Sequence, residues 1–381
     1  MAETADVHGT VVPGYEEVAP AFRASIADPS SSGAALSVWR DGVEVVALRC
    51  GVSDARTGQS WEEDTSAVVF SATKGLSALV LARLADAAAL DLDAPISSIW
   101  PEFAGTKGAL SIADVMAHRA GVSAPTRDLV LDDVLDPRHW AGLIATQEPL
   151  WKPGAGHAYH ALTYGPIVQE VVRRVTGSEL HEIFDKEIAA PLDADVNLMP
   201  GTDELERVAR LTTSPTWDAA AAASHDDSPV TRAVTLGGVL PAGLVDGDSG
   251  FNDPRIQRAG FAAAGGIGTA SGLGRIWSAM IRPTLGVRLL SDEMCAFISR
   301  PRSEGPWAFD LPAPYQRWGA GVELASEAAP TMSPRAFGHG GAGGQAAMAD
   351  PETGYAIGYV RNRLDVTNPI APILDVLRRI P

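Results

Sequence analysis

Ser71 and Lys74 are the residues whose types and spacing could do chemistry. They stand three positions apart in VVFSATKGLSALVLARLADA, an otherwise largely apolar stretch that predicts a helix beginning near Ser71. Side chains three residues apart lie on the same face of a helix. A serine becomes a nucleophile when a neighbouring base takes its proton, and a lysine buried among apolar residues can lose its charge and be that base.

Two further segments could complete a site for acyl transfer. Tyr159 stands at the end of a Pro/Gly-rich loop, and a tyrosine held near a cation can become a phenolate and act as a general base. In FGHGGAGGQ, residues 337–345, a glycine run stands at the start of an apparent strand. Glycines let a substrate approach the backbone, whose N–H groups can then stabilise an oxyanion.

These segments resemble the three motifs of class C serine β-lactamases, DD-peptidases and family VIII carboxylesterases. SATK, YHA and HGG occur in the order and at the approximate separations of those motifs, the third of which usually reads Lys-Thr-Gly or, in esterase-like members, His-x-Gly. SIADVMAHRAGV, KPGAGHAYHALTYGPIVQEVVRRVTG and AAGGIGTASGLGRI resemble flanking stretches of the same family. The resemblance extends over residues 30–375.

The resemblance implies a role for each matching residue. Ser71 would be the nucleophile, and Lys74 and Tyr159 would share its proton and deliver it to the leaving group. The backbone N–H groups of Ser71 and Ala342 would hold the oxyanion. The residues expected to line the substrate site are His160, His339, Gly340 and Gly341.

Two departures from the family pattern bear on the substrate. Ala161 stands where the family usually has an asparagine that contacts the amide of peptide-like and penicillin-like substrates. His339 stands where β-lactamases have a fixed cation, and a histidine is mostly neutral at pH 7. Both departures favour small neutral carboxylic esters, cleaved through an acyl-enzyme on Ser71.

Other functions remain as alternatives. The enzymatic one is a β-lactamase or DD-peptidase/amidase acting on a cyclic or peptide amide, and the non-enzymatic one is a penicillin-binding-like sensor. An α/β-hydrolase is disfavoured because the chain has no Gly-x-Ser-x-Gly elbow. GDSGF, residues 247–251, resembles the nucleophile segment of chymotrypsin-like proteases, but an Ala- and Gly-rich loop surrounds it, so Ser249 is not expected to be catalytic.

Composition limits the partners. The chain of 381 residues is 46% hydrophobic and 20% charged, as in a globular protein, and its formal net charge of -17 disfavours nucleic acid and anionic membranes. It has no apolar run of membrane-spanning length and no basic, then apolar, signal segment at its start, so we expect a cytoplasmic protein. Two cysteines and no Cys/His cluster favour neither a metal nor a disulfide framework, and the chemistry expected at Ser71 needs no organic cofactor. The oligomeric state stays open.

The order of the predicted elements indicates an α+β fold of the β-lactamase/DD-peptidase type. Two β-branched runs around Asp41-Gly42 predict a hairpin, and short apolar runs after Trp318 predict antiparallel strands. We expect residues 1–68 and 264–381 to form an α/β domain whose antiparallel sheet is flanked by helices. Residues 69–263 should form a mainly helical insert domain.

Local signals refine this outline. Ser111 and Asp114 predict the capped start of a short helix, and Gly177 predicts the end of a helix that begins near Leu162. Residues 200–262 show weak periodicity and are expected to form irregular segments and short helices that cover a site.

Overall fold

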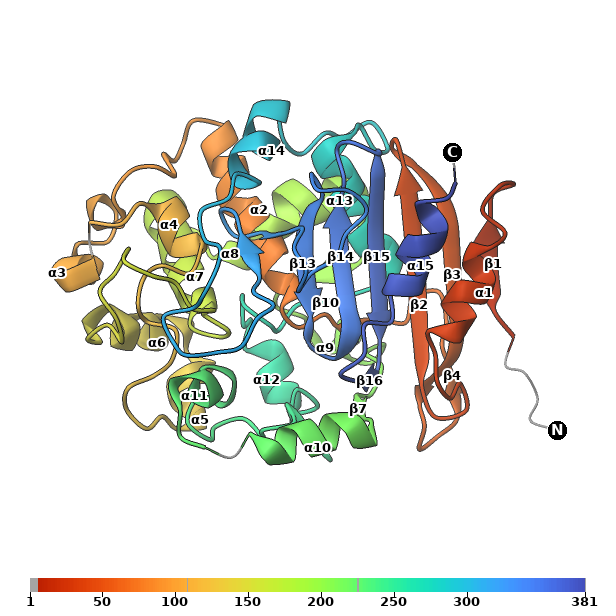
Figure 1. The fold of residues 1–381 in the computed structure, drawn as a ribbon, viewed down its shortest axis with the longest axis horizontal. Helices are drawn as coiled ribbons and strands as arrows, with labels where there is room; N and C mark the ends of the chain where they lie inside the picture. Colours follow the sequence, from red (N-terminus) through yellow and green to blue (C-terminus); the bar gives the residue numbers. More distant parts are fainter. Residues whose placement is uncertain (1–5, 108, 225, 381) are drawn as a thin grey trace.

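A nine-stranded sheet dominates the computed structural model, which describes residues 6–107, 109–224 and 226–380 (Figure 1). Its strands are β1 (His8–Val11), β2 (Gly33–Arg40), β3 (Val43–Asp54), β4 (Gln59–Ser60), β11 (Arg317–Trp318), β12 (Glu323–Leu324), β13 (Phe337–Gly341), β14 (Gln345–Ala349) and β15 (Tyr355–Arg361). Their order is β1-β3-β2-β15-β14-β13-β12-β11, with β4 beside β3, and every pair is antiparallel. The sheet thus joins both ends of the chain, and the predicted fold class is confirmed.

The predicted hairpin is the β2–β3 connection. Arg40 pairs with Val43, which leaves Asp41 and Gly42 as a two-residue loop. Both loop residues have positive φ, 49° and 84°, as a type I′ turn requires. This turn matches the twist of the flanking strands and so fixes their register.

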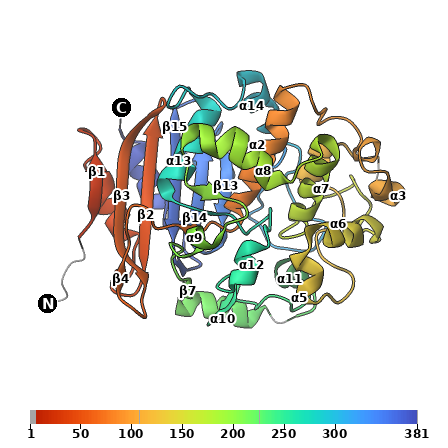
Figure 2. The same ribbon diagram turned by 180° about the vertical axis from the view of Figure 1, so that it is seen from behind.

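Helices cover both faces of the sheet (Figures 1 and 2). Helices α1 (Val18–Ala24) and α15 (Ala371–Leu377) pack together on one face. Helices α13 (Ala270–Ile281) and α2 (Ala72–Asp86) lie on the other, with α13 against β2, β14 and β15 and α2 against β13 and β14. The last of these contacts brings the start of α2 to the glycine-rich end of β13.

The central strands show why both faces must be covered. In β2, Leu36 and Val38 belong to the core under α1 and α15, whereas Ala35 and Trp39 belong to the core under α13 and α2. Successive side chains of a strand point to opposite faces, so a strand with apolar residues at consecutive positions is stable only between two layers.

The rest of the chain is mainly helical, and its larger part lies to the side of the sheet that ends in β11 (Figure 1). Its helices are α3 (Ala104–Lys107), α4 (Ile112–Met116), α5 (Leu131–Leu135), α6 (Pro137–Thr146), α7 (Tyr164–Thr176), α8 (Leu180–Phe184), α9 (Thr202–Leu205), α10 (Pro215–Ala223), α11 (Pro229–Thr235), α12 (Pro254–Arg258) and α14 (Asp292–Ile298). The predicted cap of α4 is present, since Ser111 accepts from the Asp114 N–H, and α7 ends at Gly177 with φ 77°. One hydrophobic core runs through this part and the adjoining sheet face, so the domain boundaries at 68/69 and 263/264 stay a prediction.

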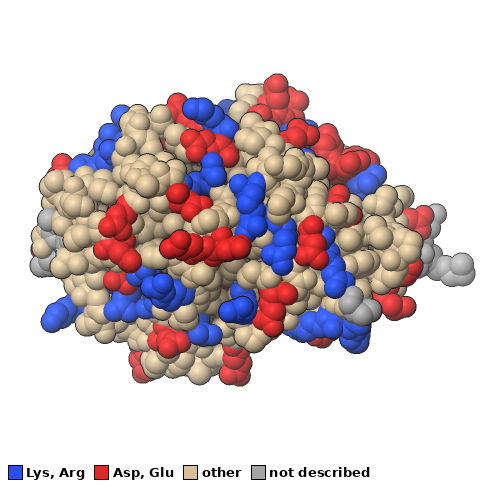
Figure 3. All heavy atoms as spheres, turned by 90° about the horizontal axis from the view of Figure 1, so that it is seen from above, with Lys and Arg blue, Asp and Glu red and all other residues tan. Residues whose placement is uncertain are grey.

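Three features bear on partners. In the part of the chain that the structure describes, no helix is long and apolar enough to cross a membrane. Among the same residues, no group of three or more His, Cys, Asp or Glu side chains is placed to hold a metal ion. On the face shown in Figure 3, acidic and basic side chains are interspersed, so neither sign gathers into a single patch there.

Candidate active site

The backbone before α2 presents Ser71 in a tight turn. Phe70 has φ 45°, a left-handed conformation that is strained for an aromatic residue. Thr73 holds this turn, because its Oγ1 donates to the Phe70 carbonyl at 2.6 Å and accepts from the Gly266 N–H at 2.9 Å. The Phe70 ring packs edge-on against Phe251, 4.9 Å between centroids. The Ser71 side chain makes no capping bond to the helix, so its hydroxyl is available.

Lys74 is fully buried one turn into α2. Its Nζ lies 3.4 Å from Ser71 Oγ, 2.6 Å from the Ala161 carbonyl and 2.9 Å from the Ala263 carbonyl. Burial lowers the pKa of Lys74 well below its usual value. A neutral amine has two N–H bonds, which the two carbonyls accept, and one lone pair, which is left for the Ser71 hydroxyl. This arrangement suits a general base.

Tyr159 is the second side chain that contacts the Ser71 hydroxyl. Its ring stacks on Trp318 at 5.2 Å and 9°, Lys74 Nζ lies 4.7 Å from the ring centroid, and its hydroxyl is hydrogen-bonded to Ser71. Burial raises the pKa of Tyr159, and the hydrogen bond with Ser71 opposes that shift only in part. Burial therefore disfavours the phenolate form of Tyr159 in the free protein. Tyr159 is a phenol that can relay a proton.

Strand β13 approaches the turn before α2 through a glycine. A Cβ at Gly341 would lie 2.3 Å from the Val69 carbonyl oxygen, so only glycine lets the strand come this close. The approach places Ala342, the first residue of the short η5 turn (Ala342–Gly344), in the same pocket as Ser71. The glycine run therefore spans the end of β13 and the turn into β14, where the sequence predicted the start of a strand. The oxyanion hole at the N–H groups of Ser71 and Ala342 stays a prediction.

These elements surround a pocket of about 470 Å³. It brings together most of the predicted site residues, which are Ser71, Tyr159, His339, Gly340, Gly341 and Ala342, and Ala161 also lines it. Aromatic side chains supply much of the remaining wall: Phe70, Trp217, Phe251 and Trp318. A mostly apolar wall with a few polar groups at one end is typical of small-molecule sites.

His160 does not belong to this pocket, and its predicted place in the substrate wall is wrong. Its Nε2 accepts from the Val122 N–H at 3.2 Å and its Nδ1 donates to the Ala158 carbonyl at 2.8 Å. Its ring stacks on His118 at 5.6 Å, and burial lowers its pKa to about 4. Both ring nitrogens are thus engaged in fixing the loop that carries Tyr159.

His339 lines the pocket as an uncharged side chain. Burial lowers its pKa to about 3, and Nδ1 donates to the Gly340 carbonyl at 2.6 Å. This tautomer leaves Nε2 as an acceptor, for which the described residues offer no partner. Burial thus leaves His339 without a positive charge, as the sequence predicted for this position of the third motif.

Glu323 is a pocket residue that the sequence did not reveal. It lies on β12, and its Oε2 accepts from the Gly340 N–H at 3.2 Å. Burial raises the pKa of its carboxyl to about 7, while the Gly340 N–H and Lys74 oppose the shift. A glutamate inside the apolar, glycine-rich run WGAGVEL is the one signal that could have drawn attention to it.

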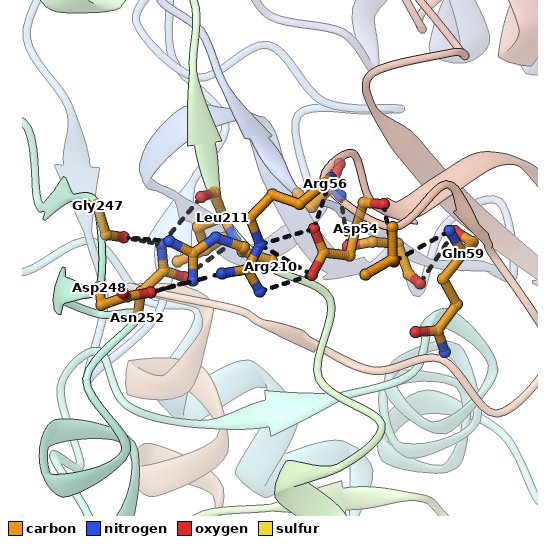
Figure 4. A network of polar contacts seen from close by, with 11 residues as sticks. Asp54, Arg56, Gln59, Arg210, Leu211, Gly247, Asp248 and Asn252 are labelled. Carbon is orange, nitrogen blue, oxygen red and sulfur yellow. Dashed lines mark hydrogen bonds and ion pairs between the residues drawn. The ribbon is translucent and has the colours of Figure 1, made fainter.

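Residues 200–262 close one side of the pocket, as expected. Leu244 and Phe251 reach the wall from the two ends of a hairpin formed by β8 (Val245–Asp246) and β9 (Ser249–Gly250). Figure 4 shows the polar network that anchors this hairpin. Asp248 lies 2.6 Å from Arg210 and 3.7 Å from Arg56, which belongs to the β3–β4 turn.

The same hairpin contains the GDSGF segment, residues 247–251. Asn252 donates to the Leu211 carbonyl at 3.0 Å and to the Gly247 carbonyl at 2.9 Å (Figure 4). Ser249 is exposed on β9 and is not among the residues that line the Ser71 pocket. The motif is thus a surface turn held by its acidic residue.

Comparison with known proteins agrees with this geometry. Residues 18–377 match the family model for Beta-lactamase. Esterase/beta-lactamase LipL of Mycobacterium tuberculosis is 34% identical over 374 residues, which are 94% of this chain and 83% of that protein.

Two solved structures share the whole architecture. A family VIII carboxylesterase is 27% identical, with a TM-score of 0.85 over 99% of this chain and 100% of that one. A penicillin-binding protein homolog from Caulobacter crescentus is 28% identical, with a TM-score of 0.84 over 98% of each chain. Both likenesses extend over the sheet and the helical part together.

Proposed function

The chain belongs to the beta-lactamase family, which makes it a serine hydrolase by relationship, and on that premise we propose that it cleaves small neutral carboxylic esters through an acyl-enzyme on Ser71. The observation that carries the proposal is the place of Lys74, whose Nζ is hydrogen-bonded to the carbonyls of Ala161 and Ala263 and lies 3.4 Å from Ser71 Oγ. The esterase names of LipL and of the carboxylesterase structure support the choice of ester.

Acylation begins when Ser71 Oγ attacks the ester carbonyl carbon. Its proton passes to Lys74, and the carbonyl π electrons move to the oxygen, which the N–H groups of Ser71 and Ala342 stabilise. The tetrahedral intermediate then collapses, and the bond to the alcohol oxygen breaks. Tyr159 passes a proton to the departing oxygen and regains one from Lys74, so the alcohol leaves uncharged.

Deacylation repeats these steps with water. A water molecule gives its proton through Tyr159 to Lys74 and attacks the acyl carbon. The second intermediate releases the carboxylic acid, and Ser71 Oγ takes the proton back. Because Lys74 starts and ends each half-reaction neutral, its lowered pKa is a requirement of the cycle.

The pocket wall supports an uncharged substrate. Lysine and arginine are absent from the described residues that line it, and His339 is neutral. A substrate carboxylate would therefore meet no positive charge. Ala161 has no side-chain amide with which to grip a peptide-like substrate.

Direct comparison of two substrate classes tests the proposal. We would measure kcat/KM for p-nitrophenyl esters of rising acyl length and for a chromogenic cephalosporin, with Ser71→Ala protein as the blank. We expect the best ester to exceed the cephalosporin by at least about a hundredfold, because two gripping contacts are missing. A higher value for the cephalosporin would contradict the ester assignment.

A β-lactamase activity is the second candidate, and the double name of LipL favours it. Cephalosporin hydrolysis that depends on Ser71 would then accompany ester hydrolysis. A penicillin-binding-like sensor would retain stable acylation of Ser71 without turnover. The contacts of Ser71, which lines the pocket, with Lys74 and Tyr159 favour an enzyme.

A further inference from the structure

The charged side chains on the pocket wall are acidic. Among the described residues that line the pocket, those with formal charge are Glu323 and Asp365. Asp365 is already engaged, since it accepts from the Thr367 N–H at 3.0 Å and lies 3.3 Å from Thr216 Oγ1. Glu323 accepts one hydrogen bond, from the Gly340 N–H, and it interacts electrostatically with Lys74 and Tyr159.

The carboxylate of Glu323 is incompletely satisfied. Strand β12 pairs with β13 so that Glu323 lies opposite Gly338, and the side chain reaches forward to the Gly340 N–H. No lysine or arginine of residues 6–107, 109–224 and 226–380 forms an ion pair with it. A half-buried carboxylate with one backbone donor has acceptor capacity to spare.

His339 adds an acceptor on the same strand pair. Its Nδ1–H donates to Gly340, so its buried Nε2 is a lone pair without a partner in the described chain. The rings of Tyr159 and Trp318 stack beside it, with Trp318 5.3 Å and Tyr159 6.1 Å from the imidazole. Carboxylate, acceptor nitrogen and aromatic faces together form a wall suited to a cationic donor.

We infer that the β12–β13 wall is a subsite for a primary ammonium group on the substrate, with Glu323 as its counter-ion. The inference rests on the proposed function and narrows it. Neutral esters remain substrates, because the reacting carbonyl is held at Ser71 and Ala342. An ester that also carries an ammonium group gains the contact with Glu323, and one that carries a carboxylate is repelled.

Binding of three small aromatic ligands tests the subsite apart from turnover. Benzylammonium, benzyl alcohol and benzoate differ mainly in charge, and calorimetric titration at pH 8 gives their dissociation constants. We expect benzylammonium to bind about tenfold more tightly than benzyl alcohol, as one charge-assisted hydrogen bond provides, and benzoate to bind most weakly. Glu323→Gln should bring the first two constants together. Glu327→Gln, at an exposed position of the next loop, is the matched control and should change neither.

The pH dependence of wild-type protein gives a second readout that needs no variant. Glu323 is ionised above pH 7, so the preference for benzylammonium should fall severalfold between pH 8 and pH 5.5. Of the other groups around Glu323, Tyr159 and His339 keep their neutral forms across that range, and Arg317 on β11 is paired with Glu304. Burial lowers the pKa of Lys74, the remaining titratable neighbour.

The outcomes separate the two proposals. Equal binding of benzylammonium and benzyl alcohol by wild-type protein, or an unchanged preference in Glu323→Gln, would overturn the subsite. Turnover of p-nitrophenyl butyrate, measured on the same samples, tests the esterase function. A protein that prefers benzylammonium but cleaves no ester would retain the subsite and lose the esterase.

Discussion

Lys74 and Lys107 lie in two different regions of the molecule, but their immediate surroundings are similar. Each is buried, with 0% and 3% of its surface exposed. Each Nζ donates to two backbone carbonyls, those of Ala161 and Ala263 for Lys74 and those of Ala145 and Gln147 for Lys107. Burial lowers the pKa of both.

The difference lies in what else each amine meets. Lys107 binds carbonyls at the end of α6, where the last carbonyls of a helix lack intrahelical donors, so it acts as a cap. Lys74 has the Ser71 hydroxyl 3.4 Å away and the Tyr159 hydroxyl bonded to the same serine. Burial lowers the pKa of both lysines, but only Lys74 has a hydroxyl within reach from which it could take a proton.

Loss of the hydroxyl should have the largest effect. Ser71→Ala is expected to lower kcat for p-nitrophenyl butyrate by about four orders of magnitude or more, since no nucleophile replaces it. Its melting temperature should stay close to that of wild type, because the side chain makes no helix cap. Ser249→Ala is the matched control on the surface hairpin, and loss of activity in that variant would revive GDSGF as the nucleophile.

Exchange of each lysine for methionine compares the two regions directly. Lys74→Met should lower kcat by about a thousandfold, the scale of a lost general base, whereas Lys107→Met should leave kcat within about threefold of wild type. Steady-state kinetics on folded samples of both variants gives the ratio. Similar losses in the two variants would mean that Lys74 acts through stability.

Tyr159→Phe sharpens the account of proton transfer. The variant keeps the ring that stacks on Trp318 and removes the hydroxyl bonded to Ser71. We expect kcat to fall about a hundredfold with KM little changed, because the ring still shapes the pocket. An unchanged kcat would assign the whole relay to Lys74.

The smallest expected effect is on the pH dependence of stability, and it should have the same sign for both lysines. Each has a pKa near 10.5 when unfolded and a lower one when folded, so between those values the unfolded chain binds the extra proton. The free energy of unfolding therefore rises with pH in that window, by at most about 1.4 kcal/mol per pH unit for each lysine. Urea titrations between pH 7 and pH 9 should give a flatter dependence for either methionine variant, and more so for Lys74→Met. A slope unchanged in Lys74→Met would mean that the folded lysine is charged.

Local patterns made much of this molecule predictable. The spacing of Ser71 and Lys74, the hairpin at Asp41-Gly42 and the cap at Ser111 each depend on a few neighbouring residues, and all three have the expected local geometry. The fold class followed from the order of such elements together with the resemblance.

The missed features depend on contacts between distant segments. Glu323 reaches the pocket because the two-residue strand β12 pairs with β13, and so short a strand has no detectable periodicity. The left-handed turn at Phe70 depends on Thr73 and Gly266, which are far apart in sequence. His160 lies outside the pocket because its two ring nitrogens are hydrogen-bonded to the backbone of Val122 and Ala158. The spacing of residues in the sequence does not predict these two bonds.

Covalent labelling tests the central claim, that a neutral Lys74 activates Ser71. Wild-type, Lys74→Arg and Lys107→Arg proteins would be treated with a fluorophosphonate, and the labelled peptide identified by mass spectrometry. We predict rapid labelling of Ser71 in wild type and Lys107→Arg, and a rate at least about a hundredfold lower in Lys74→Arg, because arginine keeps its proton. Labelling of another serine, or equal rates in the two arginine variants, would contradict the account.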